Sequence, residues 1–124
     1  MRYTKLSPSA DVTSRLRSLQ QRTGLTPNLL CRIAAIMSLE DGPIGTVRAP
    51  DEKGKEFNSY TLTGELTGIF GALVRFVEED EGHGEPLSND ELVLRFASHI
   101  HRGVGLLSVR AKSPADIARL AAAA

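Results

Sequence analysis

The first forty residues carry apolar side chains at the spacing of two helices. The first helix has one apolar stripe at i, i+4 and i+7, formed by Val12, Leu16 and Leu19. Such a stripe is typical of an amphipathic helix that buries one face. Ser7 and Pro8 suit the cap and the first helical position, and Gly24 suits a helix end. We therefore expect a helix that begins at Pro8 and ends before Gly24.

A second helix follows after a turn of two residues. Thr26 and Pro27 repeat the cap-and-proline signal, and Gly42 and Pro43 stop the helix. Its apolar side chains cover a face too wide for one short helix to bury: Leu29, Leu30, Ile33, Ala34, Ile36 and Met37. Residues 2–6 precede the pair and favour a short strand, because they include a β-branched and an aromatic residue. The order over residues 1–41 is therefore strand, helix, helix.

Residues 42–124 favour a helical extension. The predicted elements are a loop at 42–56, a strand at 57–62, a largely buried helix at 66–77, an acidic loop at 78–85, a helix that Ser88 caps and that continues past Ile100, and a short helix from Pro114 to the end. Residues 104–110 fit either a strand or irregular chain. Since no linker divides the chain, we expect one mainly α domain over residues 1–124, with minor β.

The net charge of the 124 residues is zero, but the charges are unevenly distributed. Residues 1–40 carry six basic against two acidic side chains, residues 57–91 carry one against eight, and residues 92–124 carry five against one. An exposed basic segment attracts polyanions whatever the whole molecule averages to. The asymmetry therefore indicates an anionic partner for the N-terminal third.

The composition is that of a globular protein, with 41% apolar and 24% charged residues. No apolar run approaches the roughly 20 residues that span a bilayer, and the N-terminus lacks the apolar core of a signal peptide. A single cysteine, Cys31, excludes an internal disulfide framework. We expect a cytoplasmic protein without a membrane segment.

The N-terminal pattern leaves a single strand unpaired and much apolar surface exposed. Dimerisation would solve both problems, because the strand could pair antiparallel with a second copy while four helices pack beneath the ribbon. This arrangement resembles the ribbon-helix-helix superfamily, including its Thr-Gly-x-Ser/Thr turn at residues 23–26. In that superfamily the ribbon enters the major groove and the start of the second helix meets a phosphate. The candidate DNA-binding residues are Arg2, Tyr3, Lys5, Arg15, Arg17, Arg22, Thr26 and Asn28.

In that mapping Leu6 points inward, which would aim Tyr3 and Lys5 at the DNA. The strand offers only two or three side chains for base readout, whereas arginines of the first helix would contact phosphates. The plain alternative is a short strand with two amphipathic helices whose arginines are merely solvated.

The histidines and the acidic run are weaker candidates for a functional site. His99 and His101, with His83, invite a metal site, but residues two apart on a helix point to different faces, so structural roles are favoured. The acidic run from Glu78 to Glu81, with Glu85, lacks the ligand pattern of a calcium loop. We interpret this run as a solvated turn or a docking surface for a basic partner.

Three glycines and the cysteine complete the set of candidates. Gly64, Gly68 and Gly71 fit no nucleotide-binding motif, and close helix packing explains them better. Cys31 lies among apolar neighbours, which favours a buried thiol over a sulfur carrier. No catalytic residue, metal or cofactor is predicted.

Beyond the first forty residues, the whole chain resembles the DndE family of DNA phosphorothioation proteins. The similarity lies in four segments: residues 2–7, 25–34, 64–68 and 96–103. The resemblance implies a non-catalytic member of the machinery that replaces a non-bridging phosphate oxygen with sulfur. It further implies a ribbon-helix-helix-like core, a tetramer, binding of duplex DNA and of nicked duplex in particular, and sulfur-transfer and ATPase subunits as partners.

Two other functions stay open at this point. One is a ribbon-helix-helix repressor or antidote whose C-terminal region binds a partner. The other is an enzyme, either a nickase or a sulfur carrier that uses Cys31.

Overall fold

The computed structural model describes residues 1–44, 51–81 and 85–123. Along the chain these form β1 (Lys5–Leu6), α1 (Ala10–Thr23), α2 (Pro27–Glu40), β2 (Phe57–Asn58), α3 (Ser59–Leu62), the 3₁₀ turn η1 (Gly64–Leu66), α4 (Thr67–Arg75), the π-helical segment η2 (Phe76–Glu81), α5 (Asn89–Arg110) and α6 (Pro114–Ala123). The expected mainly α fold with minor β is confirmed.

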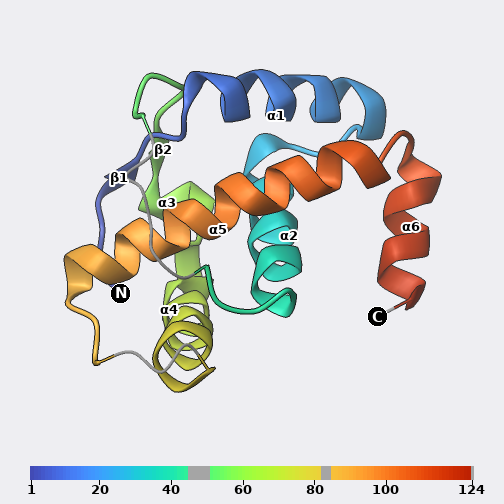
Figure 1. Cartoon of the computed structure of the whole chain (residues 1–124). Coiled ribbons are helices and arrows are strands. Elements are labelled where there is room, and N and C mark those ends of the chain that lie inside the picture. The colour runs from blue at the N-terminus through green and yellow to red at the C-terminus, as the bar shows by residue number, and fades with distance from the viewer. Residues whose placement is uncertain (45–50, 82–84, 124) are drawn as a thin grey trace.

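The longest helix, α5, runs across the middle of the molecule and packs against α1, α2 and α4 (Figure 1). It crosses α2 where Gly103 meets Ala34. A Cβ atom at Gly103 would lie 1.8 Å from the carbonyl oxygen of Ala34. The absence of a side chain therefore lets the two helices approach closely. Around this crossing the core is closed by fully buried apolar side chains, among them Leu30, Phe96, Ile100, Val104 and Leu107.

The ends of α1 and α2 are set partly by local sequence signals and partly by tertiary contacts. Gly24 ends α1 in the left-handed region at φ 78°, and the Thr26 side chain caps α2, both as predicted. The prediction that Ser7 caps α1 is wrong, because Ser9 does so and accepts from the N–H of Val12. The carbonyl of Pro8 instead accepts from the N–H of Gly54. That contact keeps Pro8 outside the helix.

The first strand pairs within its own chain. β1 and β2 are antiparallel, with Lys5 opposite Asn58 and Leu6 opposite Phe57. The strand therefore has a partner within its own chain at one of its two edges, so a second subunit is not needed to pair it. Leu6 and Phe57 are both buried, so the same pairing also places two apolar side chains in the core.

Three further segments differ from the predictions. The expected strand at 57–62 is strand only at Phe57–Asn58, because the Asn58 side chain accepts from the N–H of Thr61 and starts α3. Residues 104–110 are neither strand nor irregular, since α5 continues to Arg110. The acidic residues 78–81 are helical within η2, whereas residues 82–84 lie outside the described part of the chain.

Helix α4 is less buried than its apolar sequence predicts. Phe70 and Val74 face the core, but Ile69 is 58% exposed and Leu73 36% exposed, and Phe76 just beyond the helix is 54% exposed. The apolar periodicity cannot show this exposure, because it does not tell which face of α4 another element covers, and no element of the described chain covers the face with Ile69.

Of the three glycines expected to allow close packing, only Gly71 does so. A Cβ atom there would lie 2.9 Å from Met1. At Gly68 a side chain would meet nothing within 4 Å, and Gly64 adopts a positive φ of 52°.

Candidate nucleic-acid interface and the buried polar network

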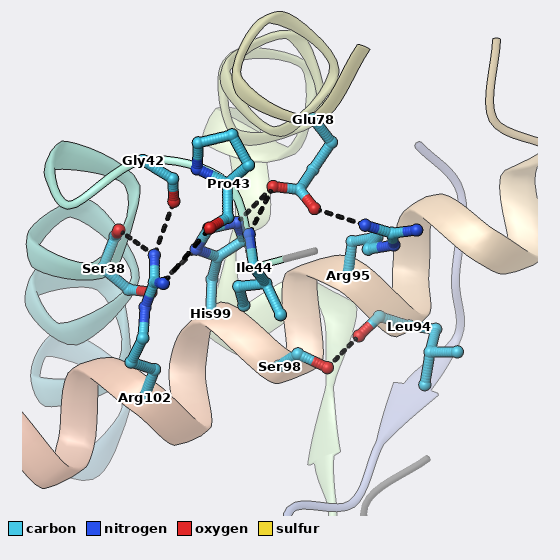
Figure 2. Close-up of polar contacts among 10 residues, drawn as sticks. All are labelled: Ser38, Gly42, Pro43, Ile44, Glu78, Leu94, Arg95, Ser98, His99 and Arg102. Carbon is cyan, nitrogen blue, oxygen red and sulfur yellow. Dashed lines mark hydrogen bonds and ion pairs between the residues drawn. The ribbon is translucent and has the colours of Figure 1, made fainter. Parts of the chain in front are cut away.

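A buried polar network joins α2, η2 and α5 (Figure 2). Glu78 of η2 accepts from Arg95 at 2.6 Å and lies 3.3 Å from Nε2 of His99. Nδ1 of His99 lies 2.7 Å from the hydroxyl of Ser38, and that hydroxyl accepts from Nε of Arg102 at 2.7 Å. Ser38, His99 and Glu78 are buried. The prediction of a solvated acidic turn is therefore wrong for Glu78.

The donors in this network fix its proton positions. Ser38 Oγ accepts from Arg102, and the Glu78 carboxylate only accepts, so a neutral His99 satisfies both neighbours when its Nδ1 accepts from the Ser38 hydroxyl. His99 then carries its proton on Nε2 and donates to Glu78. Burial lowers the pKa of His99, and the charges of Arg102 and Arg95 lower it further, against the opposing effect of Glu78. The imidazole is therefore neutral at pH 7.

The same network holds the chain that leaves α2. Nη2 of Arg102 donates to the carbonyls of Ser38 and Gly42, both at 2.6 Å, and Nη1 donates to that of Pro43 at 3.4 Å. The N–H of Ile44 donates to Glu78 at 3.0 Å. Although serine, histidine and glutamate adjoin here, the buried Ser38 hydroxyl already serves Arg102 and His99. The arrangement is structural.

A signal for this network exists in the sequence. Arg95, His99 and Arg102 lie at i, i+4 and i+7, a polar stripe on a helix whose neighbouring positions are largely apolar. His101, in contrast, faces another direction, where its Nε2 accepts from the N–H of Ser9 at 3.3 Å. No group of three or more potential metal ligands occurs among the residues that the structure describes.

The residues predicted to bind DNA from the first strand are separated by the fold. Lys5 points outward, beside Glu56 at 3.3 Å, and Arg2 is exposed while its backbone exchanges two hydrogen bonds of 2.7 Å with Asn89. Tyr3 turns inward instead. Its hydroxyl lies 2.6 Å from that of Thr63, and its ring packs against Phe96.

The predicted residues of α1 lie together with cations from the C-terminal end of the chain. Arg17 is exposed, and Nη1 of Arg22 donates to the Ser108 carbonyl at 3.4 Å. Nζ of Lys112 donates to the same oxygen at 2.9 Å, so both cations lie at the last turn of α5. Arg15 lies on α1 and Arg119 on α6, and these two helices contact each other. Arg15 and Arg17 are two residues apart and point to different sides of α1. We use the name basic face for the end of the molecule that carries these five side chains: Arg15, Arg17, Arg22, Lys112 and Arg119.

Two acidic groups pair with cations of the basic face. Asp11 pairs with Arg15 at 2.9 Å, and Asp116 pairs with Arg119 at 2.6 Å. The N–H of Lys112 lowers the pKa of Asp116, and Arg119 adds to this effect. The acidic η2 segment lies at the end of the molecule opposite α1 (Figure 1). The acidic segment and helix α1 therefore lie at different ends of the molecule.

The remaining sequence candidates have local or internal roles. Thr26 caps α2, and Asn28 lies half-buried in its first turn. Arg32, which is not one of the candidates, donates to the Leu62 carbonyl at 2.7 Å, within the molecule. Cys31 is buried, as predicted, and burial raises the pKa of its thiol to about 12.

The fold and the site define a class: a small, mainly α protein with cations gathered at one end. No described helix has the length and apolar character needed to cross a membrane. The sequence matches the family described as DNA sulphur modification protein DndE over residues 5–115. The chain therefore belongs to the DndE family, which acts in DNA phosphorothioation.

Solved structures agree with this assignment at the level of the fold. The crystal structure of DndE from Escherichia coli B7A, involved in DNA phosphorothioation modification, has a TM-score of 0.70 at 20% identity and covers 84% of this chain and 97% of that one. A DndE mutant with two glycines replaced by lysine has a TM-score of 0.69 at 20% identity, with coverages of 86% and 99%. No curated protein sequence matches the chain.

Proposed function

We propose that this protein is a non-catalytic DNA-binding subunit of a cytoplasmic DNA phosphorothioation machinery. It would hold duplex DNA, and nicked duplex in particular, through the basic face. The observation that carries the proposal is the convergence of Arg22 and Lys112 on the Ser108 carbonyl, with Arg17 exposed on the same helix as Arg22. Cations that lie 90 residues apart in sequence are thereby brought onto one surface.

The chemistry of this surface suits a phosphate backbone. Arginine and lysine neutralise phosphates and release condensed counterions, which gives affinity without sequence preference. Since Asp11 and Asp116 pair with two of the cations, about three remain for phosphates, and the slope of log K against log salt would be about −2.7 per subunit. A nicked duplex costs less energy to bend against such a surface than an intact one.

Assembly would multiply this modest charge. A homotetramer, together with the sulfur-transfer and ATPase subunits, would present several copies of the basic face to one duplex. The thiol of Cys31 is buried, and the buried hydroxyl of Ser38 is already hydrogen-bonded to Arg102, which supports a scaffold over an enzyme.

The test is a matched pair of charge reversals. Arg17→Glu with Lys112→Glu reverses two exposed charges of the basic face, whereas Lys53→Glu with Lys55→Glu makes the same charge change on exposed residues beside β2. We expect the first variant to raise the Kd for nicked duplex at least tenfold and to flatten the salt slope by about 2. The control should change the Kd by less than about threefold.

Fluorescence anisotropy with intact, nicked and single-stranded DNA gives these values, and circular dichroism checks folding. Equal losses in both variants, or a loss in the control alone, would contradict the assigned surface. Tight binding to one palindromic sequence would instead favour a repressor, and strand cleavage of a supercoiled plasmid with Mg²⁺ would favour an enzyme.

A further inference from the structure

A second surface of the molecule is an open apolar groove between α2, α4 and α6. Its volume is about 600 Å³. The floor is formed by α2 through Ile33, Ile36 and Met37, while Leu73 of α4 and Leu120 of α6 lie on the two walls. None of the residues that line the groove belongs to the basic face, so the groove requires a separate explanation.

The dimensions of the groove fit a helix. Its floor extends from Arg32 to Glu40 on α2, which corresponds to about 12 Å at the rise of an α-helix. That length accommodates about two turns, with apolar anchors at i, i+3 or i+4, and i+7. Met37 in the floor adapts its shape readily to such anchors.

Charged side chains of opposite sign mark the two ends of the groove. Glu40 and Arg110 both line it and are exposed, and each is the last residue of its helix. α2 and α6 run in the same direction (Figure 1), and Arg110 lies four residues before the start of α6, so Glu40 is at the far end of the groove from Arg110. A helix in the groove would be favoured with its positive N-terminal end at Glu40 and its negative C-terminal end at Arg110. It would then lie antiparallel to both α2 and α6.

We propose that this groove binds an amphipathic helix of a partner protein, antiparallel to α2, with a basic residue in its first turn and an acidic residue in its last. The exposed apolar face of α4 in a second copy has the wrong charges for this orientation. Glu65 precedes α4 and Arg75 ends it, so like charges would meet at Glu40 and at Arg110.

The test uses two synthetic helical peptides of 16 residues with blocked ends. Both carry leucines at i, i+3 and i+7. The first has lysine in its first turn and glutamate in its last, and the second exchanges these two residues. Because the charges of the first peptide oppose its own helix dipole, the ratio of the two affinities is compared between proteins. We expect this ratio to favour the first peptide at least fivefold more in the natural protein than in the charge-exchanged variant, because its charges pair with Glu40 and Arg110. That variant is Glu40→Arg with Arg110→Glu.

A third variant distinguishes the groove from other surfaces. Leu73→Asp places a carboxylate on an exposed position of the wall, so folding is expected to survive while both peptides lose binding. Failure of both peptides to bind, or a preference that ignores the charge exchange, would overturn the proposal. The proposal would also be overturned if sedimentation showed a concentration-dependent dimer that Leu73→Asp abolishes and that the variant Glu40→Arg with Arg110→Glu leaves intact. DNA affinity is expected to be unchanged in Leu73→Asp, which keeps this test separate from that of the basic face.

Discussion

The crossing of α2 and α5 depends on the lack of a side chain at Gly103. In Gly103→Ala, the new methyl group would lie 1.8 Å from the carbonyl oxygen of Ala34 and 2.3 Å from its carbon. To reach an ordinary contact the helices must separate by about 1.5 Å, which forfeits much of the dispersion energy across their interface. Overpacking of this kind costs about 3 kcal/mol or more, and the better helix propensity of alanine returns about 1 kcal/mol. We expect a net loss of at least about 2 kcal/mol.

Gly105, two residues further along α5, provides the matched control. A Cβ atom there meets nothing within 4 Å, so Gly105→Ala should raise the free energy of unfolding by about 0.5–1 kcal/mol through helix propensity alone. Urea denaturation followed by circular dichroism measures both variants. The difference of about 3 kcal/mol corresponds to about 2 M in the urea midpoint if the m-value is about 1.5 kcal/mol/M. Equal stability of the two variants would refute the close crossing of the helices.

Three further predictions concern buried groups. The pKa of His99 is lowered in the folded protein, so the unfolded state takes up the proton first as the pH falls. The free energy of unfolding should therefore be flat above pH 7 and decrease as the pH drops below 6.5. The variant His99→Gln should show a smaller decrease in urea titrations between pH 7.5 and 5. Arg102→Lys keeps the charge but loses the planar guanidinium that donates to three carbonyls, so it should lower the free energy of unfolding by about 2 kcal/mol. Arg15→Lys, at the exposed pair with Asp11, should lower it by less than about 0.5 kcal/mol in the same assay. The thiol of Cys31, with a pKa of about 12, should react with a disulfide reagent only as fast as the protein opens, and fast labelling at pH 8 without denaturant would contradict its burial.

The sequence by itself determined the two helices of the N-terminal third, the end of the first and the start of the second, but not the start of the first. Thr26, Pro27 and Gly24 act within one turn of their own positions, and local hydrogen bonding and φ preferences suffice to place them. The apolar spacing of α1 also identified its buried face. Sequence similarity to the DndE family, which the family match confirms, came from ordered motifs along the whole chain.

The tertiary structure decided what depends on contacts between distant residues. β1 pairs with β2 across more than fifty residues, and no local pattern specifies whether a strand pairs within its chain or with a second copy. Glu78 belongs to a charged run, yet Arg95 and His99 compensate the cost of burying it, which only their placement on the facing helix makes possible. The basic face likewise exists only because the fold brings the end of α5 to α1, where the cations Arg22 and Lys112 meet at one carbonyl oxygen. Charge and apolar periodicity are properties of the chain, whereas surfaces and buried networks are properties of its packing.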